Sequence, residues 1–500
     1  EDMKRIRNKY SMLVWALCFW TLAGCDSYLD VNPKGTLEQE KQFEDVQGYR
    51  DAMYGIYATM AKTSLYGEAL SWGFVDWLAQ LSYDKYMQSE KLVNVKAANQ
   101  YKYDDPNLEG LIGSIWGEAY QCISYANNVL ENIETVNLAE DPDYALIKGE
   151  AYGVRAMLHF DLLRLFAENI LLHPDAGGIP YAYHFDLKNK EVFSLKESYD
   201  NILGDLTKAE ACLVNDNEMN PSNAGSDYRV ARGTHCNKYA VWALKARVFH
   251  YKGDLDSAAF YAGKVIDAPD LYLVPRGAYG NKEMKRFPRG DEPKERASSE
   301  MIWGLYTRMI ADSYKNMNFE NIGGSVVVLR DDIDDVYDIS RSSATSEDAR
   351  YKAFFAKVGE ISSDYFFVRL LGTEEDTHTL QGVCLIRLPE MYYILAEATY
   401  DQDKEKAMRY FNDVRNSRGL NDYASAEVTS REEFMELVLA ERYKEFWGEG
   451  QTFFSYKREN KGFKHPDSWD HYGEVYTPSS EMFVLPWPKK ELEFGGTNKD

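Results

Sequence analysis

The stretch that decides the fold runs from residue 144 to residue 170 and reads "YALIKGEAYGVRAMLHFDLLRLFAENI". Its apolar residues recur at spacings of three and four, at Ala151, Val154, Leu158, Leu162 and Leu165. This period is typical of a long helix with one buried face. The stretch therefore predicts a helix that packs against other helices.

The same periodicity predicts mostly helix along the rest of the chain. Further long helices are expected at residues 43–62, 111–134, 198–213, 234–252, 254–267, 387–400, 403–417 and 431–447. Irregular segments are expected between them, chiefly at 66–105, 170–195, 214–233, 268–386 and 459–500. These segments hold much of the Gly, Pro, Trp and Tyr, and loops on a rigid scaffold are where binding residues usually lie.

Two helix pairs share one pattern. "GDLDSAAFYAGKVI" (253–266) and "DKEKAMRYFNDVR" (403–415) carry a small, an aromatic and a branched residue at the same offsets. These residues are Ala258, Tyr261 and Val265 in the first, and Ala407, Tyr410 and Val414 in the second. Such pairs resemble tetratricopeptide units, which stack because one unit cannot bury its face alone. We predict a mainly α fold, a tetratricopeptide-like α/α superhelix with helix pairs at about 43–134, 144–213, 234–267 and 387–447 and a loop-rich, irregular second half.

The N-terminal residues predict a lipid anchor. A basic start is followed by the apolar run Met12–Leu22, which is too short to span a bilayer. "LAGC" (22–25) then resembles a bacterial lipobox, which would make Cys25 the acylated first residue of the mature chain. We therefore expect a signal peptide over 1–24 with two extra residues before Met3, a tether over 25–42 and one domain over 43–500. An ordinary signal peptide with a chance cysteine is the alternative.

Charge and cysteines exclude several classes of partner. The chain carries a net charge of −23, and removing residues 1–24 makes it −25, which argues against nucleic acid or an anionic lipid surface as partner. The later cysteines form no CxxC or other metal-ligand pattern and are interpreted as buried thiols, with a disulfide left open. They are Cys122, Cys212, Cys236 and Cys384. No cofactor and no metal ion are expected.

Enzyme motifs are missing from the sequence. The chain contains no HExxH, GxSxG, GxGxxG or P-loop pattern, and no pair of carboxylates stands out as in a glycoside hydrolase. We therefore expect a protein that is not an enzyme.

The densest candidate for ligand binding is "YGEALSWGFVDWLAQLSYDKYMQ" (66–88). A sugar site pairs flat aromatic rings with amide or carboxylate acceptors, and this segment offers both. The candidate residues are Trp72, Trp77, Tyr83, Tyr86, Asp76 and Gln80. The alternative is that its tryptophans only pack the segment against the first helix.

A second candidate is the segment 271–297, whose basic residues stand out in an acidic protein. Tyr279, Arg286 and Arg289 could meet an acidic ligand or a partner protein. An exposed loop without a ligand is the alternative.

Several motifs in order carry a resemblance to a known family. After the lipobox they read "YLDVNPKG", "YRDAMYGIYATM", "VRAMLHFDLLRLF", "GGIP", "ARGTHCNKYAVWALKARVFHYKGDLDSAAFYAGKVI", "SSEMIWGL", "IRLPEMYYILAEA", "FNDVRNSRGL", "LAERYKEFWGEGQTFFSYKR" and "LPWPKKEL". The chain thereby resembles the SusD/RagB family of nutrient-binding outer-membrane lipoproteins, from Cys25 to about Leu492. It departs from the family motif at Thr452 and Ser455, where we expect residues that fix packing inside the domain.

The resemblance implies a function and a location. The protein would be anchored in the outer membrane by its acylated cysteine, face the cell exterior and act as the lid of a SusC-like TonB-dependent transporter barrel. It would capture an oligosaccharide and deliver it for import. An oligopeptide ligand is the alternative, and a scaffold that binds surface proteins without transport is a second. Whether further surface lipoproteins join the complex stays open.

Overall fold

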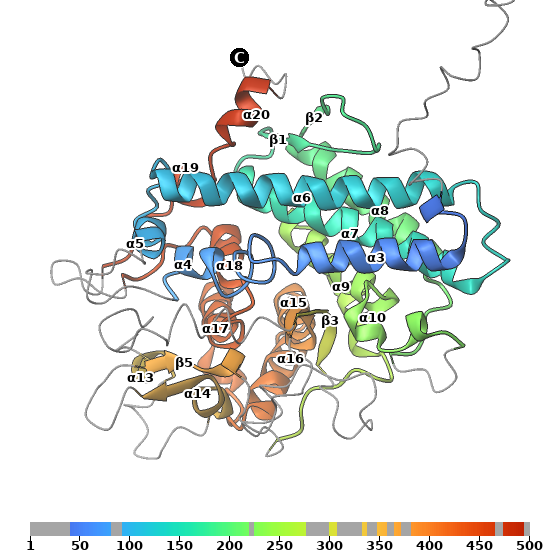
Figure 1. Cartoon of the computed structure of the whole chain (residues 1–500). Helices are drawn as coiled ribbons and strands as arrows, with labels where there is room; N and C mark the ends of the chain where they lie inside the picture. The colour runs from blue at the N-terminus through green and yellow to red at the C-terminus, as the bar shows by residue number, and fades with distance from the viewer. Residues whose placement is uncertain are drawn as a thin grey trace, which may run out of the picture. The chain divides into compact units, whose positions relative to one another are not determined.

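The structure is a computed structural model that describes residues 41–81, 93–219, 225–276, 300–307, 333–337, 348–357, 365–371, 382–465 and 474–494 (Figure 1). The chain divides into two compact units, residues 1–51 and 52–500. Of the first unit the structure describes residues 41–51, which include the beginning of α3 (Val46–Met60). The predicted single domain over 43–500 stays a prediction, and the description below concerns the second unit.

Long helices dominate the second unit, and all nine predicted helices are confirmed. Besides α3 they are α6 (Pro106–Ile133), α7 (Pro142–Phe166), α8 (Leu195–Cys212), α9 (Lys238–Lys252), α10 (Leu255–Ile266), α15 (Leu388–Thr399), α16 (Lys404–Ser417) and α17 (Arg431–Glu445). Short helices lie between and after them, at α4 (Phe74–Leu78), α5 (Val93–Asn99), α13 (Ile333–Val336), α14 (Ala349–Phe354), α18 (Thr452–Glu459), α19 (Ser480–Phe483) and α20 (Lys489–Phe494).

Local sequence explains where these helices begin and end. The Asp141 side chain accepts a hydrogen bond from the Asp143 N–H at 2.8 Å, and Pro142 occupies the first helical position of α7. Ser194 and Glu197 form a reciprocal capping box at the start of α8. Gly253 adopts a left-handed φ of 86° between α9 and α10. This glycine lets the two helices form a tight hairpin.

Neighbouring helices pack in pairs. α6 packs on α7, α7 on α8, α9 on α10, and α15 on α16, while α10 also packs on α15 across a long gap in sequence. Figure 1 shows α6, α7 and α8 side by side, with α15, α16 and α17 gathered below them. The predicted mainly helical, tetratricopeptide-like fold is confirmed.

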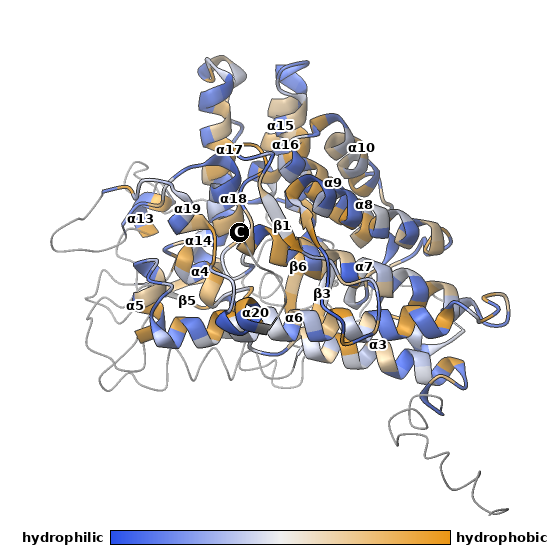
Figure 2. Cartoon of the chain, turned by 90° about the horizontal axis from the view of Figure 1, so that it is seen from above, coloured by the Kyte–Doolittle hydropathy of each residue, from blue (hydrophilic) through white to orange (hydrophobic). Residues whose placement is uncertain are grey.

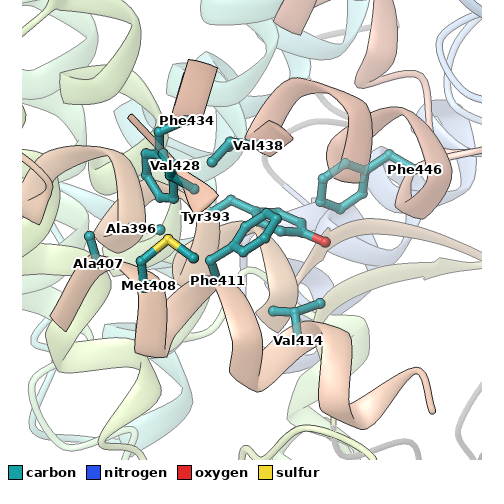
Figure 3. Packing of buried hydrophobic residues seen from close by; sticks show 10 residues of the cluster. All are labelled: Tyr393, Ala396, Ala407, Met408, Phe411, Val414, Val428, Phe434, Val438 and Phe446. Atoms are coloured by element: carbon teal, nitrogen blue, oxygen red, sulfur yellow. The ribbon is translucent and has the colours of Figure 1, made fainter. Parts of the chain in front are cut away.

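The core between α15, α16 and α17 shows how such a pair packs (Figure 3). Ala407 is fully buried at the crossing, and Phe411 and Val414 follow it at spacings of four and three on the same face of α16. Ala258 and Val265, the equivalents in the other predicted pair, are fully buried as well, whereas the aromatic residues of the predicted pattern, Tyr261 and Tyr410, are half-buried. Hydrophobic and hydrophilic residues alternate along α6 in Figure 2, as a helix with one buried face requires.

Strands are few and short among the described residues. They form three antiparallel pairs, β1 (Gly177–Pro180) with β2 (Val192–Ser194), β3 (Met301–Tyr306) with β6 (Gly382–Arg387), and β4 (Phe355–Lys357) with β5 (Tyr365–Phe367). The β3–β6 pair joins two stretches within and at the end of the predicted irregular segment 268–386, Met301–Tyr306 and Gly382–Arg387. β6 leads directly into α15 of the helical scaffold.

The four later cysteines are free thiols in the structure. Cys122 and Cys236 are buried, which confirms the expectation for these two, whereas Cys212 and Cys384 are half-buried.

A network of buried ion pairs connects β6 with the C-terminal ends of α16 and α17. The Glu445 carboxylate accepts hydrogen bonds from Arg387 and Arg418, each at 2.7 Å, and from Arg350 at 3.1 Å. Arg418 also reaches Glu300 at 2.8 Å, next to β3. Burial opposes ionisation of Glu445, but the guanidinium groups of Arg418 and Arg387 outweigh it and hold the pKa of this carboxyl well below its usual range.

A buried lysine ties the end of α7 to the C-terminal segment. The Lys457 ammonium donates hydrogen bonds to the backbone carbonyls of Arg164 at 2.6 Å, Ala167 at 2.7 Å and Phe483 at 2.8 Å. Burial lowers the pKa of Lys457 to about 7.

This pKa predicts a pH-dependent stability. Between pH 7 and about 10.5 the unfolded chain keeps a proton on Lys457 that the folded chain releases, so the free energy of unfolding rises with pH by at most about 1.4 kcal/mol per unit from this group. We expect Lys457→Met to abolish that rise, so that the stability gap between wild type and variant widens by roughly 1–2 kcal/mol from pH 7 to pH 9. Urea unfolding of wild type and Lys457→Met at pH 7 and at pH 9 measures this change in the stability gap. Lys461→Met, at an exposed position, is the control, and a constant gap for Lys457→Met would contradict the prediction.

Candidate functional site

The predicted aromatic segment lies inside the protein. Trp72 and Trp77 are each only 3% exposed, and the Trp72 indole N–H donates to the Gly67 carbonyl at 2.9 Å. The rings therefore pack in the interior in this structure, which agrees with the packing alternative for them. Ligand contact by these two rings stays a prediction.

Asp76 holds this segment against a turn that lies far away in the sequence. Its carboxylate accepts a hydrogen bond at 2.8 Å from the N–H of Gly448, which lies between α17 and α18. Gly450 in the same turn has a φ of 65°, and a Cβ atom there would lie 2.2 Å from the Leu70 carbonyl oxygen. Burial raises the pKa of Asp76 well above its usual value. The "WGEGQ" turn and the segment around Trp72 thus form one closely packed unit.

Gln80 connects the segment to aromatic residues nearer the surface. Its side-chain amide donates to the Asn99 carbonyl at 2.9 Å and to the Tyr101 hydroxyl at 3.1 Å. The Tyr101 hydroxyl in turn donates to the Leu78 carbonyl at 3.0 Å. Gln80 therefore fixes the position of the Tyr101 side chain.

Three half-buried rings follow on from Gln80, and we call Tyr101, Tyr476 and His465 the aromatic ledge. The ring centroids of Tyr101 and Tyr476 lie 5.0 Å apart edge to face, and those of Tyr476 and His465 lie 3.6 Å apart. Backbone hydrogen bonds from His465 to Glu474 and from Tyr476 to Phe463 hold the last two rings on one face of two paired antiparallel stretches, 463–465 and 474–476.

The aromatic ledge offers the aromatic surface on which a sugar can stack. Its rings supply flat apolar surface, and the Tyr476 hydroxyl donates to the backbone carbonyl of Asn99 at 3.0 Å. Burial raises the pKa of Tyr476 to about 12, so its hydroxyl stays protonated at neutral pH. Sequence reasoning missed these residues because no local pattern relates Tyr101 to His465 and Tyr476, which lie far along the chain.

A second concave surface, the α6 groove, has a volume of about 1000 Å³. Its floor includes Gly110, Gly113 and Gly117, where a Cβ atom would meet no neighbouring atom within 4 Å. One wall is the chain that links β1 to β2, and the other is Pro488–Glu491 at the start of α20. Figure 1 shows the β1–β2 hairpin and α20 on the same side of α6.

Lysines surround this groove although the whole chain is acidic. The charged residues of its lining are Lys188, Lys190, Lys489, Lys490, Glu109, Asp186 and Glu491. Lys489 pairs with Glu109 at 2.6 Å, and Lys190 pairs with Asp186. In the described part of the chain, Lys188 and Lys490 form no salt bridge, and Leu187 beside them is fully exposed.

Several predicted residues lie outside the described residues. They are Cys25, Tyr83, Tyr86, Tyr279, Arg286 and Arg289, and their roles stay predictions. The two departures from the family motif are described, and both are buried as expected: the Ser455 hydroxyl donates to the Gln451 carbonyl at 2.9 Å and accepts from Arg442 at 3.0 Å, and Thr452 is only 1% exposed.

Comparison with models of known protein families shows which family the chain belongs to. Residues 27–249 match the model of a SusD-like family described as "Starch-binding associating with outer membrane", and residues 367–484 match that of the SusD family, SusD/RagB. The two matches together span more than half of the chain. The chain belongs to the SusD/RagB family. This is a family of nutrient-binding proteins.

Relatives of known sequence match part of this SusD/RagB protein. SusD-like protein P2 of Formosa agariphila is 28% identical over 278 residues, which cover 54% of this chain and 48% of that protein. SusD-like protein P25 of the same organism is 19% identical over 302 residues, 59% of this chain and 51% of that protein. The chain thus spans about half the length of the curated relatives it matches.

Solved structures share the fold over nearly the whole chain. A SusD superfamily protein from Bacteroides thetaiotaomicron superposes with a TM-score of 0.69 at 20% identity, over 90% of this chain and 98% of that chain. A SusD-like carbohydrate binding protein from Bacteroides vulgatus gives a TM-score of 0.66 at 19% identity, over 89% and 95%. These similarities establish the fold. Within the described ranges, no helix has both the length and the apolar character to cross a bilayer.

Proposed function

We propose that this SusD/RagB protein is a surface lipoprotein that captures a nutrient oligomer, an oligosaccharide, and acts as the lid of a SusC-like TonB-dependent transporter. The observation that carries the proposal is the match of both ends of the chain to SusD family models, one of which is described as starch-binding and associated with the outer membrane. The carbohydrate-binding name of the Bacteroides vulgatus structure agrees with a sugar ligand.

The lipid anchor is part of this proposal. Acyl chains on Cys25 would hold the protein at the outer membrane, since each buried CH₂ contributes about 0.8 kcal/mol. The polar tether that follows Cys25 would let the body of the protein move over the mouth of a barrel.

We place capture of the sugar at the aromatic ledge. Tyr101, Tyr476 and His465 are half-buried, so part of each side chain is exposed and could pack on the C–H face of a sugar. The ledge is continuous with the predicted segment through Gln80, whose amide holds Tyr101. The protein would therefore bind its ligand beside the Trp72 segment.

Tyr476→Ala is expected to weaken sugar binding about fivefold, because one stacked ring contributes on the order of 1 kcal/mol. Tagged wild type and Tyr476→Ala are purified from their native membrane in detergent, and mass spectrometry identifies proteins, small molecules and any acyl chains on Cys25. We expect a TonB-dependent barrel with both proteins and a sugar oligomer only with wild type.

Tyr125→Ala is the matched control, because Tyr125 lies on the surface of α6, 40% exposed. Peptides in place of the sugar would overturn the ligand and keep the lid role. A protein recovered without any barrel would overturn the lid role and favour a scaffold.

A further inference from the structure

The α6 groove has the size of a site for an extended chain. Its lining on α6 runs from Pro106 to Asn127, which is about 30 Å along the helix axis. About nine residues of extended polypeptide cover the same length. With a volume of about 1000 Å³ it is at the upper end of ordinary small-molecule pockets.

The polar side chains deep in the groove are already engaged within the protein. The Asn127 amide donates to the Ala182 and His184 carbonyls at 3.0 and 3.2 Å, and its oxygen accepts from Arg155 at 2.7 Å. The Tyr120 hydroxyl donates to the Pro180 carbonyl at 2.6 Å. A hydroxyl-rich sugar would therefore find few free partners on this floor, and the buried Trp116 offers it no open ring face.

The groove instead offers apolar space with a lysine outside any described salt bridge on each wall, and Glu491 stands beside the one on the α20 wall. The glycine positions of the floor leave room for side chains of an occupant, and the fully exposed Leu187 adds an apolar contact at one lip. Lys188 stands on the β1–β2 wall and Lys490 on the α20 wall, so one cation without a salt bridge among the described residues faces the groove from each side. Negative charge on both flanks of an occupant would complement them.

We propose that the α6 groove binds an extended acidic segment of a partner protein. The segment lies along α6 with small apolar side chains over Gly113 and its neighbours, and its carboxylates pair with Lys188 and Lys490. This surface is separate from the aromatic ledge, and the proposal does not depend on nutrient capture.

A random library of displayed twelve-residue peptides, selected on the full chain, tests the proposal. We expect the enriched peptides to be acidic, and the best synthetic peptide to bind in fluorescence anisotropy with an affinity that falls as salt rises. Gly113→Leu fills the floor, and the double variant Lys188→Glu, Lys490→Glu reverses the charge of both walls. Each is expected to weaken binding at least tenfold.

Matched controls sit on other helices. Gly263→Leu changes a glycine of α10 that also faces open space, and Lys406→Glu with Arg409→Glu reverses two exposed charges of α16. Both should bind the peptide as wild type does, and Gly113→Leu should stay folded because leucine favours a helix over glycine. The proposal is overturned if no acidic peptide is enriched, if Gly113→Leu binds equally well, or if a sulfated hexasaccharide displaces the peptide and binds more tightly.

Discussion

Glu445→Gln is expected to lower the free energy of unfolding by about 3–5 kcal/mol, because it removes the negative charge of a buried carboxylate that Arg387, Arg418 and Arg350 share. Arg387 and Arg418 each lie 2.7 Å from the Glu445 carboxylate, and both are at least 97% buried at their side chains. A buried guanidinium does not lose its proton at any pH that the protein meets. The folded variant therefore cannot remove the excess positive charge by deprotonating an arginine. Urea unfolding followed by circular dichroism measures the loss.

A glutamate on the same helix provides the control. Glu436 has a side chain that is 61% exposed and lies 3.3 Å from Lys461. Glu436→Gln is expected to change the stability by less than about 0.5 kcal/mol, since exposed ion pairs contribute little. If Glu445→Gln lowered the free energy of unfolding as little as Glu436→Gln does, burial of the arginines would not require the Glu445 charge, and the prediction would be wrong.

The same network reaches the segment that supports the aromatic ledge. Arg387 also binds Glu449 at 2.7 Å, and the neighbouring Gly448 N–H donates to Asp76. The ion pairs around Glu445 therefore hold the turn on which the Trp72 segment is docked. Partial unfolding in Glu445→Gln should loosen the ledge together with the scaffold.

Phe411→Ala is expected to destabilise the protein by about 3–5 kcal/mol through the cavity it leaves. Phe411 is fully buried in the cluster between α15, α16 and α17, where it points toward Tyr393 (Figure 3). Its ring packs edge to face on Phe434 of α17, with centroids 5.7 Å apart. Loss of the Phe411 ring would thus weaken the contact of the α15–α16 pair with α17. Thermal and urea unfolding both measure the resulting loss of stability.

Phe260→Ala is the matched control for this change. Phe260 lies on α10, the equivalent second helix of the other predicted pair, but it is 62% exposed. Its removal should cost less than about 1 kcal/mol, because little apolar surface is lost from the interior. Equal losses in the two variants would mean that the α15–α17 cluster does not limit the stability of the chain.

The helical scaffold was predictable because its determinants are local. A stripe such as Ala151, Val154 and Leu158 repeats within a few residues, and a cap such as Asp141 with Pro142 acts within one turn. In α10 and α16 the small and branched residues of the predicted pattern are buried, whereas its tyrosines are half-buried. Ala258 and Ala407, the small residues, are both fully buried.

The residues of the candidate site could be predicted less well from the sequence. Trp72 and Trp77 have the composition of a sugar platform, yet the turn at Gly448 and Gly450, almost 400 residues away, covers this segment. Tyr101 and Tyr476 form one ledge although no short motif contains both of them.

The sequence by itself determined the helices, their order and the family resemblance, since each rests on spacings within one helix or on motifs along the chain. Only the tertiary structure decided which aromatic rings are buried, which form the aromatic ledge, and that glycines of α6 face a groove with lysines on both sides. The physical reason is that exposure depends on what packs against a residue, and here the packing partners come from distant parts of the chain.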